Sequence, residues 1–109
     1  MNTAKSIDTG CRKIFQHYKF EHQKRKLWEE MGELLEALSA VQHSQSPRDF
    51  DNVVEELADV HVLLRQFQLH FSIGDENIQR IMKAKVERTI ERMKNDVATN
   101  LKDVTTDWK

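Results

Sequence analysis

Apolar residues recur at steps of three and four along most of this 109-residue chain, which is the spacing of one face of an α-helix. The pattern predicts four helices, at about residues 4–19, 22–42, 47–71 and 75–95. The second helix has a regular core stripe, and so does the third: Leu27, Met31, Leu34, Leu38 and Val41, then Val53, Leu57, Val60, Leu64, Phe67 and Phe71. An all-α fold, a four-helix bundle, is therefore expected.

Residues with strong turn or capping preferences mark the ends of these helices. Ser46 can cap the third helix, because Pro47 follows at the first helical position and Asp49 supplies an acid in the first turn. Gly74 is expected to end that helix and Asp75 to cap the fourth. Residues 1–95 are predicted to form one domain. Residues 96–109 are predicted to form a polar, partly ordered tail that docks through Trp108.

The third helix has a second apolar side, which lies outside its main stripe and consists of Val54, Ala58, Val62 and Leu69. A helix that is apolar nearly all round is buried on two sides. A chain of this length offers few places to bury a second face, so we expect a homodimer or homotetramer built across the second and third helices, which would complete the bundle.

Composition excludes several classes of protein. The net charge of −1 gives no basic surface, so nucleic acid is not an expected partner. No apolar run approaches the length of a membrane span, and the N-terminus lacks the apolar core of a signal peptide, so no membrane association is expected. The single Cys11 excludes an internal disulfide and fits a reducing compartment, so the expected location is cytoplasmic.

Two acidic tetrads interrupt the apolar pattern: Glu30-Met31-Gly32-Glu33 and Glu56-Leu57-Ala58-Asp59. Carboxylates three residues apart lie on one helical face, about one turn from each other. At about 100° per residue, each tetrad places its first carboxylate inside the apolar arc and its second at the edge. An ionised carboxylate facing a core is costly unless a cation compensates it. Four such carboxylates on two antiparallel helices indicate a site for a hard divalent cation, Mg²⁺.

A simpler interpretation is a solvated acidic face with ordinary ion pairs, for example between Lys26 and Glu30 at i, i+4. For either tetrad alone that interpretation is the more common one, because short motifs match by accident. Two tetrads with the same phase inside apolar arcs favour metal binding.

The stretch from Leu27 to Leu34, followed by the stretch from Glu55 to Val60, resembles the MazG-like nucleotide pyrophosphohydrolases of the all-α NTP pyrophosphatase superfamily. The resemblance covers about residues 5–95. It implies hydrolysis of a nucleoside or deoxynucleoside triphosphate to the monophosphate and pyrophosphate, with Mg²⁺ as cofactor and Mn²⁺ as an alternative. By motif position it assigns metal binding and catalysis to four residues: Glu30, Glu33, Glu56 and Asp59. Glu29 could hold a water molecule, although its helical angle argues against direct ligation.

A triphosphate also needs cationic donors. In the fourth helix Lys85, Arg88 and Arg92 form one cationic stripe, and Lys26 precedes the first tetrad. We expect Lys26, Lys85 and Arg88 to bind substrate, and Arg92 is a weaker candidate. Without a Walker A glycine loop, side chains and metal must hold the phosphates. A stacking surface for the base could come from the aromatic residues near the N-terminus, although such residues are more often core: Phe15, His17, Tyr18, Phe20 and Trp28.

Other functions remain open at this stage. Within the superfamily they are a dimeric dUTP pyrophosphatase and a phosphoribosyl-ATP pyrophosphohydrolase. Outside enzymes, the alternative is a non-catalytic helical interaction protein of the same fold. The two intact tetrads argue against that alternative, since a chain without activity could lose a ligand freely.

Overall fold

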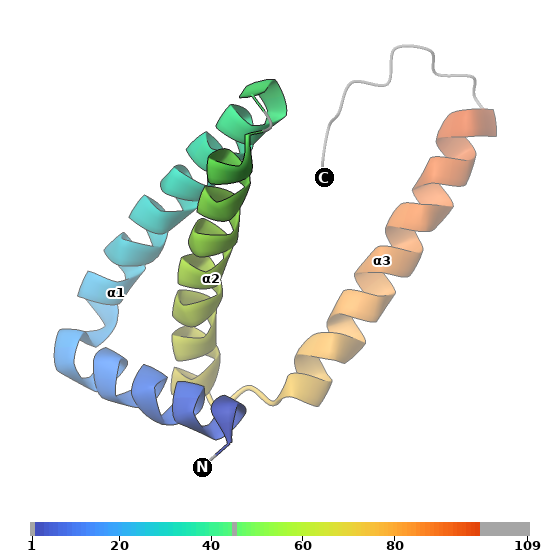
Figure 1. The fold of residues 1–109 in the computed structure, drawn as a ribbon. Coiled ribbons are helices and arrows are strands. Elements are labelled where there is room, and N and C mark those ends of the chain that lie inside the picture. Colours follow the sequence, from blue (N-terminus) through green and yellow to red (C-terminus); the bar gives the residue numbers. More distant parts are fainter. Residues whose placement is uncertain (1, 45, 99–109) are drawn as a thin grey trace. The chain divides into compact units, whose positions relative to one another are not determined.

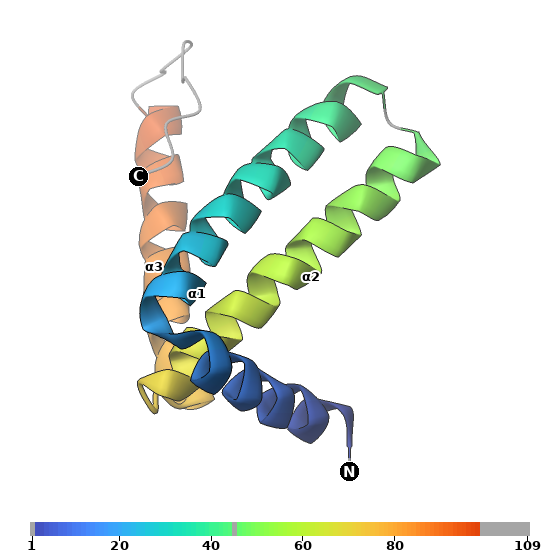
Figure 2. The same cartoon turned by 90° about the vertical axis from the view of Figure 1, so that its left-hand side faces the viewer.

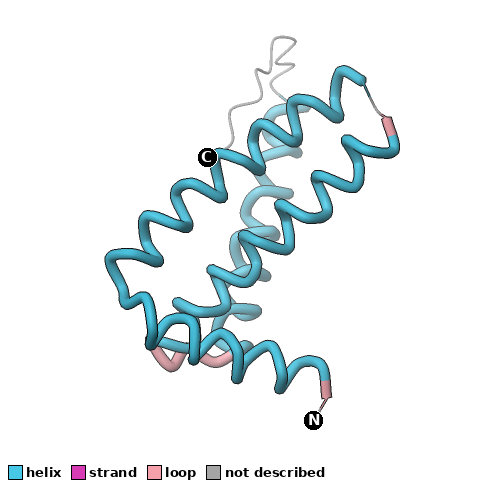
Figure 3. The backbone as a smooth tube through the Cα atoms, turned by 60° about the vertical axis from the view of Figure 1, so that its left-hand side comes forward, coloured by secondary structure: helices cyan, strands magenta, loops and turns pink. Residues whose placement is uncertain are grey.

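The computed structural model describes residues 2–44 and 46–98, and every regular element within them is an α-helix (Figures 1 and 3). The helices are α1 (Thr3–Ser44), α2 (Pro47–His70) and α3 (Asp75–Ala98). The predicted all-α class is confirmed. α1 and α2 form one compact unit, and α3 belongs to a second. None of these helices carries an apolar run long enough to cross a membrane. The first three residues of the predicted tail continue α3, and residues 99–109, with Trp108, lie outside the described residues.

The first two predicted helices are the two arms of α1, which breaks sharply at Lys19 (Figures 1 and 2). Lys19 has φ 74° and ψ 170°, a conformation that residues with a side chain rarely adopt. The arm before Lys19 packs on the end of α2. Arg65 binds Asp8 through two contacts of 2.7 and 2.8 Å, and the buried Cys11 thiol donates to the Val62 carbonyl at 3.7 Å. The chain thus bends at Lys19, between the two predicted helices, without an intervening loop.

The arm after Lys19 and α2 run side by side and bury one line of residues between them, which we call the seam (Figure 2). All buried or half-buried positions of that arm fall on the seam, at alternating steps of four and three. This is the spacing of a coiled-coil interface. The seam residues are Gln23, Leu27, Glu30, Leu34, Ala37 and Val41 on α1, and Val53, Glu56, Val60, Leu63 and Phe67 on α2.

The seam corrects part of the predicted core. Residues such as Met31 and Leu38 continue the i, i+4 pattern from Leu27 and Leu34 but lie outside the seam, and both are exposed. The same holds for Leu57 and Leu64 on α2. The exposed apolar surface of this unit is therefore larger than the sequence pattern predicted.

The predicted cap of α2 is confirmed, because Ser46 Oγ accepts a hydrogen bond from the Asp49 backbone at 3.1 Å. The turn before α3 differs from the prediction. Gly74 occupies the cap position, since its carbonyl accepts from the backbone of Asn77 and Ile78, and Asp75 lies in the first turn. There its negative charge interacts favourably with the positive end of the helix dipole. The left-handed residue of this turn is Ser72, with φ 56°.

Candidate metal centre

Three carboxylates from the two tetrads converge across the seam. One oxygen from each of Glu30, Glu33 and Glu56 lies within 4.8 Å of the others. Glu30 is buried, with 6% of its surface exposed, Glu56 is half-buried and Glu33 is exposed. Glu30 and Glu56 occupy seam positions, which explains their burial. The order of burial matches the helical phase expected from the sequence, with one carboxylate of each tetrad inside the apolar arc.

Asp59 lies beside this cluster and outside it. It follows Glu56 by three residues on α2, is exposed, and lines the same cavity as Glu29 and Glu30. Burial and the nearby Glu30 carboxylate raise the pKa of Asp59 above its usual value. The structure thus joins three of the four predicted acids and places the fourth next to them.

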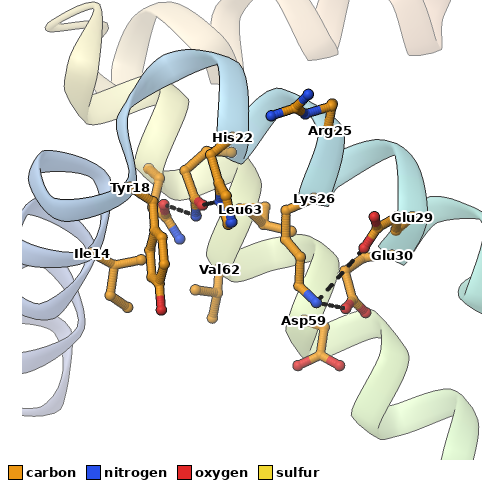
Figure 4. Close-up of a pocket in the computed structure, with 12 residues that line it drawn as sticks. Ile14, Tyr18, His22, Arg25, Lys26, Glu29, Glu30, Asp59, Val62 and Leu63 are labelled. Atoms are coloured by element: carbon orange, nitrogen blue, oxygen red, sulfur yellow. Dashed lines mark hydrogen bonds and ion pairs between the residues drawn. The ribbon is translucent and has the colours of Figure 1, made fainter.

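Lys26 is the cation nearest to the cluster on α1 (Figure 4). Its Nζ lies 3.2 Å from Glu30 Oε1 and 4.0 Å from Glu29 Oε2. The hydrogen bond to Glu30 raises the pKa of Lys26, so the ammonium stays charged at neutral pH. Burial works against the charge of Glu30, but Lys26, together with hydrogen bonding from the Glu33 and Glu56 carboxyl groups, outweighs it, and the pKa of Glu30 lies below its usual value. The simple i, i+4 pair is therefore present, at one carboxylate of the cluster.

One lysine leaves the cluster with an excess of negative charge. Burial, together with the charges of Glu33 and Glu30, raises the pKa of Glu56 to about 7. Glu30 likewise raises the pKa of Glu33. Like charges held this close oppose full ionisation unless a cation joins them.

Two oxygens of the cluster also lack any hydrogen bond. Among the side-chain oxygen and nitrogen atoms of residues 2–44 and 46–98, two are buried and have no hydrogen-bond partner: Glu30 Oε2 and Glu56 Oε2. An unpaired buried carboxylate oxygen costs about 1–3 kcal/mol or more. A divalent cation of the Mg²⁺ type prefers carboxylate oxygens, so the donor set and its two unpaired atoms fit such an ion.

Glu30 of the cluster and the adjacent Asp59 line a cavity of about 460 Å³ that continues away from them between the two helices (Figure 4). Its far part is lined by Tyr18, His22, Gln23 and Gln66. Sequence reasoning considered Tyr18 for stacking but missed the two glutamines. Gln23 precedes Glu30 by seven residues, so a polar residue recurring at the heptad spacing was the signal that could have found it.

The other predicted substrate residues differ in position. Trp28 is 82% exposed and Phe15 is buried, and neither lines the cavity. Lys85, Arg88 and Arg92 occupy exposed positions of α3. Phosphate binding by Lys85 and Arg88 stays a prediction.

Comparison with known proteins agrees with the sequence motifs. The family model described as the MazG nucleotide pyrophosphohydrolase domain matches residues 18–97, a range that contains both acidic tetrads. The resemblance found in the sequence is thereby confirmed, and the match supports nucleotide pyrophosphohydrolase activity in general. Neither the curated proteins nor the solved structures give a match.

Proposed function

The chain belongs to the MazG nucleotide pyrophosphohydrolase family, and from this premise we propose that it hydrolyses nucleoside or deoxynucleoside triphosphates to monophosphate and pyrophosphate in a Mg²⁺-dependent reaction. The observation that carries the proposal is the pair of unpartnered buried oxygens, Glu30 Oε2 and Glu56 Oε2, on facing helices. A purely structural cluster would leave these atoms at a cost to stability, whereas a metal site uses them.

Glu30, Glu33 and Glu56 would hold the ion, with Asp59 as the adjacent fourth carboxylate. When bound, Mg²⁺ or Mn²⁺ would neutralise charge on the phosphoryl oxygens. The remaining roles belong to side chains. Lys26 projects into the cavity as a permanent cation and is suited to pair with a phosphate oxygen.

Glu29 lines the cavity outside the cluster, at 4.0 Å from Lys26. Its position suits a carboxylate that orients a water molecule and accepts its proton, as general base catalysis requires. The cavity lining also includes Val62 and the buried Leu63.

A screen for pyrophosphate release tests this proposal. The full chain is incubated with each common NTP and dNTP, with Mg²⁺ and then with excess EDTA. We expect pyrophosphate and monophosphate from at least one nucleotide, and no release in EDTA. Release of orthophosphate, or turnover that survives EDTA, would rule the proposal out.

The cationic stripe of α3 gives a separate prediction. If Lys85 and Arg88 bind phosphate, Lys85→Ala and Arg88→Ala should each lower kcat/KM at least about tenfold, on the order of 1.4 kcal/mol. Lys83→Ala is the matched control, because Lys83 pairs with Glu87 at 3.0 Å in an exposed ion pair that contributes little. Steady-state kinetics measure this. If the kcat/KM of Lys85→Ala and Arg88→Ala is no lower than that of the Lys83→Ala control, the phosphates are held elsewhere.

We also propose that the protein is a homo-oligomer. The second apolar side of α2 is largely open: Val54 and Ala58 are exposed, and Val62 joins them. Val54→Glu should place an unpaired charge in the subunit contact, at a cost of several kcal/mol, and yield monomers. Val54→Thr keeps the shape without the charge and should stay assembled. Sedimentation velocity at assay concentration measures both, and a monomeric wild type would refute the proposal.

A further inference from the structure

A one-way chain of hydrogen bonds crosses the seam at the far part of the cavity. Gln23 Nε2 donates to Gln66 Oε1 at 2.9 Å, and both glutamines are buried. His22 Nδ1 lies 2.7 Å from Gln23 Oε1. Because the amide nitrogen of Gln23 faces Gln66, its oxygen accepts from His22 Nδ1. Each member therefore fixes the orientation of the next.

This chain leaves one donor group at its end. The oxygen of Gln66 faces Gln23, and no described residue pairs with the Gln66 amide nitrogen. Among the described residues, this nitrogen is not one of the fully buried side-chain atoms that lack a partner. It therefore has access to a cavity. Gln66 lines the cavity of the acids, and it also borders a second, mainly apolar cavity. Only the first is also lined by Gln23, Glu30 and Asp59.

The amide pair has a fixed offset from the acids. Gln23 precedes Glu30 by seven residues on α1, and Gln66 follows Asp59 by seven residues on α2. At about 1.5 Å per residue, each offset is about 10.5 Å, or two turns. The antiparallel helices therefore carry the two cavity-lining acids, Glu30 and Asp59, at the same separation from the amide pair. A nucleotide whose phosphates lie at the acids would extend its base toward the glutamines.

An aromatic wall lies beside the amides. The rings of Tyr18 and His22 are stacked, with centroids 4.4 Å apart and planes inclined by 16°. Both residues line the cavity, and Tyr18 is about half exposed. A planar heterocycle can stack on such a surface, and base stacking on aromatic side chains does not by itself select a base.

We propose that the Gln23–Gln66 pair is the base-reading element of this site and selects nucleotides whose base carries a carbonyl oxygen at position 4 of a pyrimidine or position 6 of a purine. The proposal rests on the proposed function for the placement of the phosphates. A fixed amide donor accepts uracil, thymine, guanine and hypoxanthine at these positions. It rejects cytosine and adenine, because their amino groups are donors themselves.

The test compares two pairs of substrates that differ at this position: UTP with CTP, and ITP with ATP. The wild type should favour the carbonyl member by at least about tenfold in kcat/KM. Gln66→Met keeps the length of the side chain without its amide and should reduce the preference to within about twofold. Gln66→Glu presents an acceptor and should reverse the preference. Gln42→Met, at an exposed position of the same bundle, is the control and should keep the wild-type ratio.

A wild type without preference, or a Gln66→Met variant with the wild-type ratio, would overturn the inference. Binding of free nucleosides to the metal-free protein separates this inference from the proposed function, since it needs neither phosphate nor metal. Side-chain amide NMR signals of Gln23 and Gln66 should shift with uridine and not with cytidine. Such selective shifts without any triphosphate turnover would support the base site and refute the activity. Turnover with equal shifts for both nucleosides would refute the base site alone.

Discussion

Glu30→Gln should lower kcat/KM for Mg²⁺-dependent hydrolysis by at least about 100-fold, on the order of 2.7 kcal/mol, while the protein stays folded. Glutamine keeps the shape of the side chain and removes the charge that a hard cation requires. Glu30 is the most buried acid of the cluster, and one of its oxygens has no hydrogen-bond partner in the described structure, as expected for a direct ligand of the ion. Steady-state kinetics and circular dichroism measure the two effects.

The matched control is Glu36→Gln. Glu36 is an exposed glutamate on the same arm of α1 and lies off the seam, so its loss should leave turnover within about twofold of the wild type. Equal losses in both variants would point to general damage. Wild-type turnover in Glu30→Gln would remove the carboxylate cluster from the reaction.

Glu56→Gln should stabilise the metal-free protein at pH 8 and have no such effect at pH 4. The pKa of Glu56 is about 7 in the folded chain and 4.5 ordinarily. Between these values the folded state holds a proton that the unfolded state has lost, so the contribution of Glu56 to stability falls as pH rises from about 4.5 to 7. It stays low above that range. Glutamine does not titrate and removes this part of the pH dependence.

Melting temperatures in EDTA between pH 4 and pH 8.5 measure this difference. The variant should melt several degrees higher than the wild type at pH 8, and Mg²⁺ should raise the melting temperature of the wild type more than that of the variant. A difference between the two proteins that does not change with pH would show that Glu56 is not held in an environment that resists its charge.

Features that depend on local spacing could be predicted from the sequence. The helical phase of Glu30 and Glu56 follows from neighbours within two turns, and the structure places both on the seam. The cap at Ser46 follows from its own side chain and was also predicted correctly. Helical phase alone likewise distinguished the more buried acid of each tetrad, Glu30 or Glu56, from the exposed acid at the edge.

Features that depend on tertiary packing could not be predicted in this way. The break in α1 falls where the first predicted helix ends, but Lys19 is neither glycine nor proline, so its left-handed conformation could not be predicted. The N-terminal arm packs on α2 beyond this bend, through Asp8 and Arg65. The narrow seam leaves Met31 exposed although it continues an apolar stripe. The pairing of Gln23 with Gln66 joins residues 43 positions apart, and the periodicity of each helix does not by itself show which residues of the two helices face each other.

The most direct test of the metal centre is a titration of the full chain with Mn²⁺, followed by electron paramagnetic resonance of the free ion. The account predicts that the wild type removes Mn²⁺ from solution, that excess Mg²⁺ releases it, and that Glu30→Gln combined with Glu56→Gln leaves the signal of free Mn²⁺ undiminished. A wild type that binds no Mn²⁺, or a double variant that binds it as tightly as the wild type, would contradict the assignment of these carboxylates as the metal site.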